Sequence, residues 1–193
     1  MPLPDRRTSS ARLGSFNDQE SYVSHFFSVT GTDLITDRLI LRSWTPAEVA
    51  AVLDGTRLPH WAGDFPAEGD HVIAGLFAEQ PAWLGEYGHR QLIERDGGLV
   101  VGSIGLFWPP SDGDLEIGYG VVPSRQGRGY ATEATRALTE FAYGAPGVGT
   151  VSAGVELSNP SSIRVLEKAG FQRSHTDTEQ QTARYRATPP AGR

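Results

Sequence analysis

The chain has 193 residues, of which 38% are hydrophobic and 21% charged, a composition that suits one domain with a full hydrophobic core. Its formal net charge of -6 argues against broad nucleic-acid binding, which needs clustered Lys and Arg, and no apolar run approaches the roughly 20 residues of a membrane helix. The absence of cysteine excludes disulfides, thiolate metal sites and a cysteine nucleophile, and we expect a cytoplasmic protein.

Residues 1–32 combine Pro, Ser, Arg and Gly with one apolar cluster, "SYVSHFF", and show no sustained hydrophobic period. They are predicted to form an N-terminal arm. Two interpretations of this arm are open, a partly ordered segment and a docking or dimer contact. A single domain is predicted over residues 33–193.

The first half of this domain is predicted to contain three strands and two helices. "RLILRSW" alternates apolar and polar side chains, as a half-buried strand does, and Thr45 and Pro46 then supply an N-cap and a first helical position. The turn "DGG" between two strand-forming runs predicts a hairpin. The expected elements are a strand at 38–44, helices at 47–53 and about 68–79, and strands at 90–95 and 99–108.

The second half alternates strands and helices. "DLEIGYGVV" (114–122) has a period of two, which is typical of a strand with one apolar face, and apolar residues then recur at helical spacing over 131–142. A strand at 150–157 leads to "NPSSIRVLEKAGF", where Asn159 is the expected N-cap and Gly170 the C-terminal stop of a helix. Short strands are expected after this helix.

The stretch "VVPSRQGRGYATEA" (121–134) places two glycines and two arginines between a strand and a helix. The first N–H groups of a helix have no intrahelical acceptor, and together with the helix dipole they attract anions. Gly127 and Gly129 lack side chains that would keep a phosphate away, while Arg128, with Arg125 as a second candidate, adds charge suited to phosphate. The loop is interpreted either as a pyrophosphate site or as a turn that only needs glycine.

Two other phosphate-binding motifs fit this loop poorly. A P-loop requires G-x-x-x-x-G-K-[ST], and no Lys-Ser/Thr pair follows these glycines. A dinucleotide fingerprint requires Gly or Ala at the position of Thr132. A nucleotide-dependent oxidoreductase is therefore disfavoured.

The run Gln126-Gly127-Arg128-Gly129-Tyr130-Ala131 is similar to the [QR]-x-x-G-x-[GA] signature of the GCN5-related N-acetyltransferase (GNAT) family, whose loop binds the pyrophosphate of acetyl-CoA. "LEIGYGVVP", "GYATEA" and "NPSSIRVLEKAGF" resemble the RimJ/RimL-like branch, which acetylates protein N-terminal amines and related acceptors. The three motifs occur in the family's order. The resemblance covers about residues 34–187 and is strongest over 114–171.

This resemblance implies a mixed α/β (α+β) GNAT fold, with a central, mostly antiparallel twisted sheet of six to seven strands that splays in the middle and is flanked by about four helices. It implies acetyl-CoA as co-substrate and no metal. The loop would hold the pyrophosphate, and backbone groups freed at the splay would hold the pantetheine arm. The implied cofactor-binding residues are Val121, Val122, Gln126, Gly127, Arg128, Gly129, Tyr130, Ala131, Thr132 and Asn159.

A primary amine must lose a proton before it attacks a thioester, since its pKa is about 7.7–8.0 for an α-amine and about 10.4 for lysine. Glu116 lies on the strand face opposite Leu115 and Ile117 and is either a solvated strand residue or a general base. The resemblance places an acidic residue there as base, often acting through a water. Gly118 and Gly120 in the same strand favour a bulge or a close backbone approach.

Many family members carry a helix tyrosine, in the pattern N-x-x-A-x-x-L-Y, that protonates the departing thiolate. Leu166 stands at this position and has no proton to donate. Ser162 matches the serine suggested for this role in the RimL-like branch and is the second predicted catalytic residue, although a local hydrogen bond in the first helical turn is the alternative. Asn159 and Thr132 have similar alternatives, because each can cap a turn or contact the cofactor.

The loop "LPHWAGDFPAEGDH" lies where the family lines its acceptor side, so the side chains of His60, Trp61, Asp64 and His71 either bind a cation or serve packing and surface roles. The leading hypothesis is an acetyl-CoA-dependent N-acetyltransferase acting on a protein N-terminal amine or lysine. The alternatives are a small amine as acceptor, such as an aminoglycoside or polyamine, and a non-catalytic CoA-binding regulator. A homodimer is compatible with either enzyme.

Overall fold

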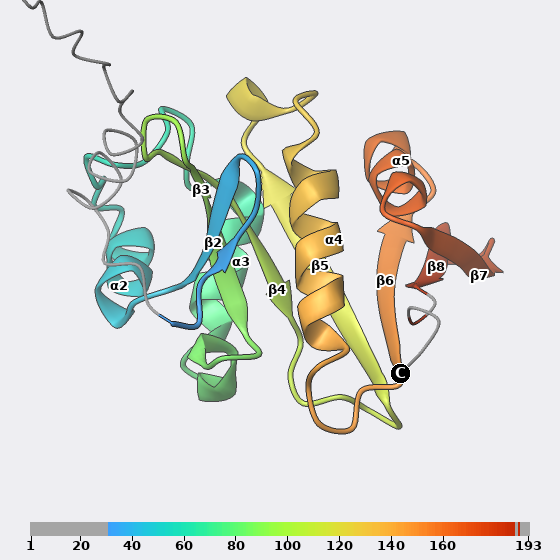
Figure 1. Ribbon diagram of the computed structural model, residues 1–193. Coiled ribbons are helices and arrows are strands. Elements are labelled where there is room, and N and C mark those ends of the chain that lie inside the picture. The colour runs from blue at the N-terminus through green and yellow to red at the C-terminus, as the bar shows by residue number, and fades with distance from the viewer. Residues whose placement is uncertain (1–30, 188, 190–193) are drawn as a thin grey trace, which may run out of the picture.

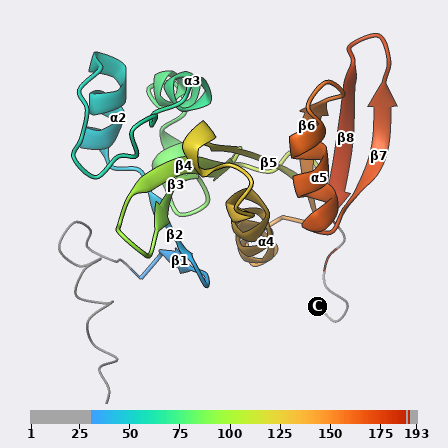
Figure 2. The same cartoon turned by 90° about the horizontal axis from the view of Figure 1, so that it is seen from above.

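The computed structural model describes residues 31–187 and residue 189. Nearly all of the predicted N-terminal arm, residues 1–30, lies outside the described residues. The described part is a central sheet with helices on both faces (Figures 1 and 2). Helices α2 (Pro46–Asp54) and α3 (Glu68–Leu76) lie on one face, and α4 (Tyr130–Ala142) and α5 (Pro160–Lys168) lie on the other. This is the mixed arrangement of one sheet flanked by helices that the sequence predicted.

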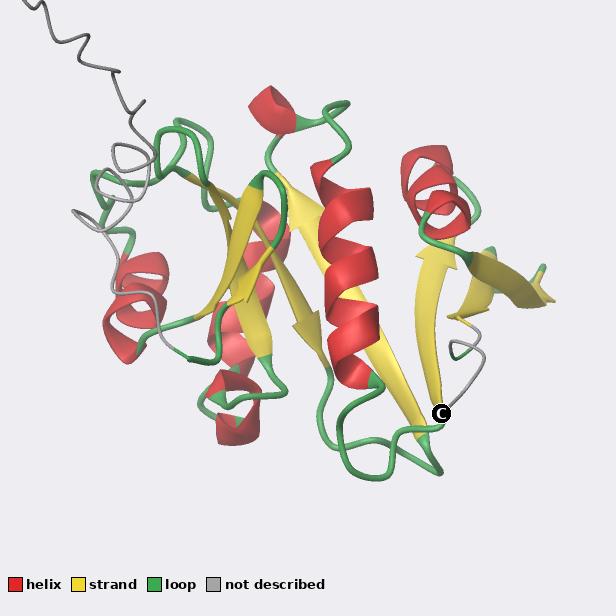
Figure 3. Ribbon diagram, in the orientation of Figure 1, coloured by secondary structure: helices red, strands yellow, loops and turns green. Residues whose placement is uncertain are grey.

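The sheet has eight strands in the order β1-β2-β3-β4-β5-β6-β8-β7, and among these described strands every neighbouring pair is antiparallel except β5–β6 (Figure 3). The expected number, six to seven, was too low because the two-residue β1 is formed only by pairing with β2. The strands are β1 (Leu34–Ile35), β2 (Leu39–Ser43), β3 (His89–Glu94), β4 (Val100–Leu106), β5 (Asp114–Val121), β6 (Thr150–Glu156), β7 (Phe171–Asp177) and β8 (Thr182–Ala187).

Helices α2 and α5 begin at residues that their sequences mark as N-termini. At α2, Thr45 and Glu48 form a capping box and Pro46 is the first residue. At α5, Asn159 Oδ1 accepts from the Ser162 N–H at 3.0 Å. The described helices are α2 (Pro46–Asp54), α3 (Glu68–Leu76), α4 (Tyr130–Ala142) and α5 (Pro160–Lys168), with 3₁₀ turns η1 (Pro81–Leu84) and η2 (Pro123–Arg125). None of the helices within residues 31–187 is long and apolar enough to span a bilayer.

The core lies on both sides of the central strands. Every residue of β3 and β4 is buried, because helices cover both faces of this part of the sheet. In β5 the burial alternates, with Leu115 and Ile117 buried and Glu116 between them partly exposed. Because of this alternation, the polar side chains of β5 lie on the face of the strand opposite Leu115 and Ile117.

Candidate active site

Strand β5 changes its partner along its length. Residues 114–116 pair in parallel with β6, whereas residues 117–121 pair in antiparallel with β4. Beyond Glu116 the described part of β6 continues beside β8 and no longer pairs with β5, and Figure 1 shows the two strands moving apart. We call this separation of β5 and β6 the split. It is the splay that the resemblance implied, and it begins at Glu116.

Main-chain groups of alternate β5 residues face the split. The N–H of Val122 donates to Val101 O, and the N–H of Phe107 donates to Glu116 O, each at 2.9 Å. Even-numbered residues therefore direct their main-chain groups toward β4, and odd-numbered residues direct theirs to the opposite edge. The residues that face the split in this way are Ile117, Tyr119 and Val121.

Of the two valines predicted to offer main-chain groups, only Val121 has them on the edge of β5 that faces the split. Its carbonyl accepts a hydrogen bond from the side-chain amide of Gln126 at 2.9 Å. The expectation for Val122 was wrong, because its N–H is bonded to Val101 and its carbonyl accepts from the Arg125 N–H at 2.9 Å. Strand alternation places neighbouring residues on opposite edges, so the two valines cannot share one edge.

The loop from Gln126 to Thr132 has the backbone shape of an anion site. Gly127 and Gly129 have φ values of 75° and 83°, in the left-handed region that favours glycine. Gly129 is the N-cap of α4, and the first intrahelical bond runs from the Glu133 N–H to the Gly129 carbonyl. The N–H groups that precede this bond point out of the helix end; they belong to Tyr130, Ala131 and Thr132.

A buried carboxylate beside the loop binds Arg125 and lies near Arg128. Glu94, the last residue of β3, accepts at Oε1 from Arg125 Nε and from the Tyr130 hydroxyl, each at 3.0 Å. Nη1 of Arg128 lies 3.8 Å from the same oxygen, and its side chain is 51% exposed. Arg125 is thus used inside the protein, and Arg128 is the loop cation that remains open to a ligand.

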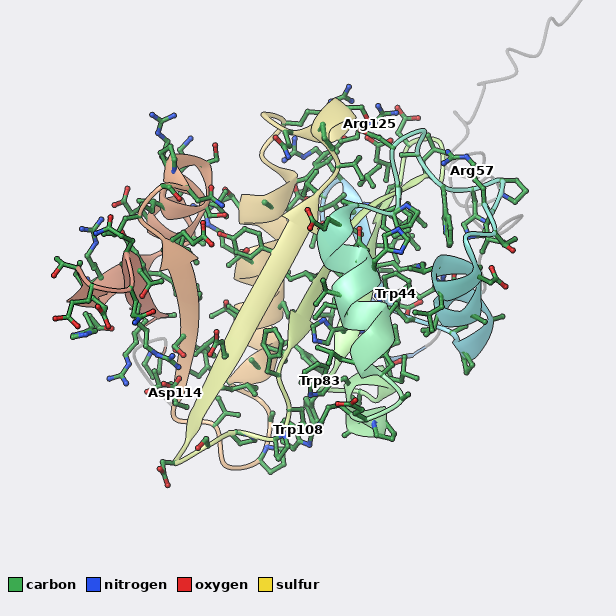
Figure 4. The ribbon with its side chains drawn as sticks, turned by 180° about the vertical axis from the view of Figure 1, so that it is seen from behind. Trp44, Arg57, Trp83, Trp108, Asp114 and Arg125 are labelled. Carbon is green, nitrogen blue, oxygen red and sulfur yellow. The ribbon has the colours of Figure 1, made fainter. Side chains whose placement is uncertain are left out.

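The 3₁₀ turn before the loop is held by a second carboxylate. Asp64 Oδ2 accepts from the Ser124 N–H at 2.8 Å, and Oδ1 accepts from the Ser124 hydroxyl at 2.7 Å. Arg57 donates to three carbonyls between residues 61 and 65, and Figure 4 shows Arg57 and Arg125 at the same end of the molecule. The predicted acceptor candidate Asp64 therefore fixes the loop that follows β5.

The other acceptor candidates have separate surroundings. Trp61 is buried and packs edge-on against Phe65. His60 Nε2 lies 3.7 Å from Glu48, and burial lowers the pKa of His60. His71 is exposed on α3. The rings of His60 and Trp61 meet edge-on with their centroids 6.3 Å apart, whereas Asp64 is bonded to Ser124. The described residues contain no cluster of His, Asp and Glu suited to a metal ion.

Glu116, the predicted base, lies at the start of the split. Its side chain is 42% exposed, and Oε2 lies 3.5 Å from Arg184 Nη1 on β8. Asp114, two residues earlier on the same face, lies beside β6 at the opposite end of β5 from Arg125 (Figure 4). Glu116 is therefore the last β5 residue that pairs with β6, and water can reach its carboxylate.

The predicted residues of α5 lie at the start of that helix. Asn159 serves as N-cap, and Ser162 is half-buried in the first turn. Leu166 is 1% exposed in the core, so a polar group at this position would be buried.

Tyr119 is a residue that the sequence did not single out. Its hydroxyl donates to the Ser162 carbonyl at 3.1 Å, which joins β5 to α5 across the split. Burial raises the pKa of Tyr119 to about 12. No local signal could have revealed this contact, because it joins residues 43 positions apart.

Comparison with known proteins identifies the class to which this arrangement belongs. Residues 38–172 match the acetyltransferase (GNAT) domain family. The chain is 29% identical over 146 residues to the uncharacterized N-acetyltransferase YoaA of Bacillus subtilis (strain 168), a match that covers 72% of this chain and 82% of YoaA. It is 32% identical over 89 residues to the uncharacterized N-acetyltransferase YjdG of the same organism, covering 46% of this chain and 53% of YjdG.

Solved structures share the fold. A GNAT-family acetyltransferase from Bacillus anthracis superposes with a TM-score of 0.59 at 17% identity, covering 81% of this chain and 98% of that one. AAC(6')-Ib, solved in complex with parmomycin and acetyl-CoA, superposes with a TM-score of 0.55 at 23% identity, covering 79% and 94%. At these identities the likeness is one of fold.

The family match thus shows the class of protein to which this split sheet and glycine loop belong, the acyltransferases. The chain belongs to the GNAT acetyltransferase family and is an N-acetyltransferase. Members of this family use acetyl-CoA as the acetyl donor.

Proposed function

We propose that this chain transfers the acetyl group of acetyl-CoA to a protein N-terminal amine or a lysine, as in the RimJ/RimL-like branch. The main support for an acetyl-CoA site is that the loop 126–132 follows directly on the split. Gln126 links the two directly through its hydrogen bond to Val121 O. A diphosphate needs N–H donors and a cation, and the amide-containing pantetheine arm needs hydrogen-bond partners on a strand edge. One continuous stretch of chain supplies both sets of partners.

The loop residues divide the work of binding. The N–H groups of Tyr130, Ala131 and Thr132 donate to the diphosphate, and Arg128 neutralises its charge. The main-chain edge at 117–121 receives the pantetheine arm in the manner of an added strand. Asn159 borders that arm while its side chain caps α5. When bound, acetyl-CoA supplies an acyl group activated as a thioester.

Glu116 accepts the proton of the acceptor ammonium in this proposal, directly or through a water. Three features support the role: its place where β5 and β6 part, its orientation away from buried Leu115, and its access to solvent. Ser162 is the proposed proton donor to the departing thiolate. A thiol has a pKa of about 8.5, so this second proton transfer contributes less to the rate.

The acceptor is assigned on the sequence motifs, and a small amine is the second candidate. Coupled thiol release from acetyl-CoA, measured with N-terminal peptides, lysine peptides, aminoglycosides and polyamines, separates the two. We expect turnover with the peptides. Turnover with small amines alone would replace the proposed acceptor, and bound CoA without turnover in any pool would indicate a CoA-binding regulator.

Glu116→Gln tests the base. Its kcat/KM at neutral pH should fall by about 10²–10⁴-fold, while the Kd for CoA stays the same, because the side chain lies on the face opposite the apolar core and away from the loop. The matched control is Glu156→Gln, an exposed carboxylate at the far end of β6. Equal activity of the two variants would contradict the assignment of Glu116.

A further inference from the structure

Arg184 on β8 reaches across β6 to the carboxylates of β5. On the sheet it pairs directly with Gly154 of β6. Its two terminal nitrogens have different partners: Nη1 lies 3.5 Å from Glu116 Oε2, whereas Nη2 donates to Ser152 Oγ at 2.8 Å and to Asp114 Oδ2 at 3.3 Å. Three strands therefore meet at one guanidinium.

The backbone of Gly154 lies beside this contact. A Cβ placed there would lie 3.5 Å from Glu116 Oε1. The Glu116 carboxylate therefore lies against the glycine that separates it from Arg184. A branched side chain at this position would push the carboxylate away, while the rest of the strand would keep its pairing.

We propose that Arg184 is a positioning residue for acetyl transfer, which holds the Glu116 carboxylate over Gly154 at the start of the split. This inference rests on the proposed role of Glu116. Nη2, anchored on Ser152 and Asp114, keeps Nη1 beside Oε2 while the acceptor ammonium approaches the other carboxylate oxygen, Oε1. A carboxylate held in one rotamer needs less ordering when the amine arrives, which favours the reactive geometry.

The size of the effect follows from exposure. The side chains of Arg184 and Glu116 are 40% and 42% exposed, so solvent screens their attraction and the pair adds little to folding stability. Its contribution should therefore appear in kcat. A loss of about three- to tenfold is expected for Arg184→Met, within the usual range for coupled neighbours.

A double-mutant cycle tests the proposal, with kcat and the KM for acetyl-CoA measured for Arg184→Met, Glu116→Gln and the double variant. Arg184→Met should lower kcat about three- to tenfold with an unchanged KM, and Arg184→Lys should recover part of the loss. In the Glu116→Gln background the Arg184 substitution should have no further effect. Gly154→Val should lower kcat similarly, although it leaves Arg184 in place.

The control is Arg186→Met on the same face of β8, since Arg186 Nη2 lies 3.5 Å from Asp114; its kcat should stay within about twofold of wild type. An equal loss for Arg184→Met in both backgrounds, or an equal loss for Arg186→Met, would overturn the positioning role alone. Full activity of Glu116→Gln would instead overturn the base, and the role of Arg184 with it.

Discussion

Replacing Glu94 by Gln should destabilise the protein by about 2 kcal/mol. The Glu94 side chain is 9% exposed, and its Oε1 accepts from Arg125 and Tyr130 at 3.0 Å, with Arg128 at 3.8 Å. Glutamine keeps the shape and one acceptor oxygen but removes the charge. A hydrogen bond to a charged group is worth about 1.5–3 kcal/mol against about 1 for a neutral one, and the second arginine adds to the difference.

Thermal unfolding measures this effect. For a chain of this length each kcal/mol corresponds to about 2–4 °C in Tm, so Glu94→Gln should lower Tm by about 4–8 °C. Glu116→Gln is the matched control, because that carboxylate is 42% exposed and has one pairing at 3.5 Å, which is worth at most about 1 kcal/mol. If the two substitutions lowered Tm by the same amount, this would contradict the role of Glu94 in holding the loop.

Two further predictions concern buried rings. Burial lowers the pKa of His89 to about 4. Below about pH 6.5 this histidine is therefore protonated in the unfolded chain but stays neutral in the folded chain. The free energy of unfolding should consequently fall by about 2 kcal/mol from pH 7 to pH 5. The free energy of unfolding of His89→Gln, measured by urea unfolding at several pH values, should lack this pH dependence. An unchanged pH dependence in the variant would contradict the prediction. Tyr119→Phe removes the hydrogen bond to Ser162 and should lower the free energy of unfolding by about 1 kcal/mol. Its ultraviolet absorbance should also lack the phenol titration near pH 12. A variant that still showed this titration would contradict the assignment to Tyr119.

Local signals were sufficient for much of the fold. The capping box at Thr45, the Asn159 cap and the alternation around Glu116 each depend on residues within a few positions. These signals predicted α2, α5 and β5 close to their observed bounds. The glycine loop could also be predicted from local sequence, since the two residues with left-handed backbone, Gly127 and Gly129, are ones whose type favours it.

Contacts between distant segments could not be predicted in the same way. The pairing of Glu116 with Arg184 depends on the register of β8 against β6, and the sequence of either strand alone does not fix register. The incorrect expectation for Val122 has the same origin, since the edge toward which its N–H points follows from pairing with β4. Glu94 was missed because a carboxylate at a strand end resembles any solvated residue.

Calorimetric titration of CoA into wild type and Gly129→Leu tests the central claim most directly, because leucine at φ 83° is strained by about 1–2 kcal/mol and its Cβ would lie 3.4 Å from Arg38 Nη2. The control is Gly55→Leu at the end of α2, where φ is 75° and no atom lies within 4 Å of the added Cβ. CoA should bind wild type and Gly55→Leu alike, and at least about tenfold more weakly to Gly129→Leu. Undiminished binding by Gly129→Leu, or no binding by wild type, would contradict a diphosphate site at the N-terminus of α4.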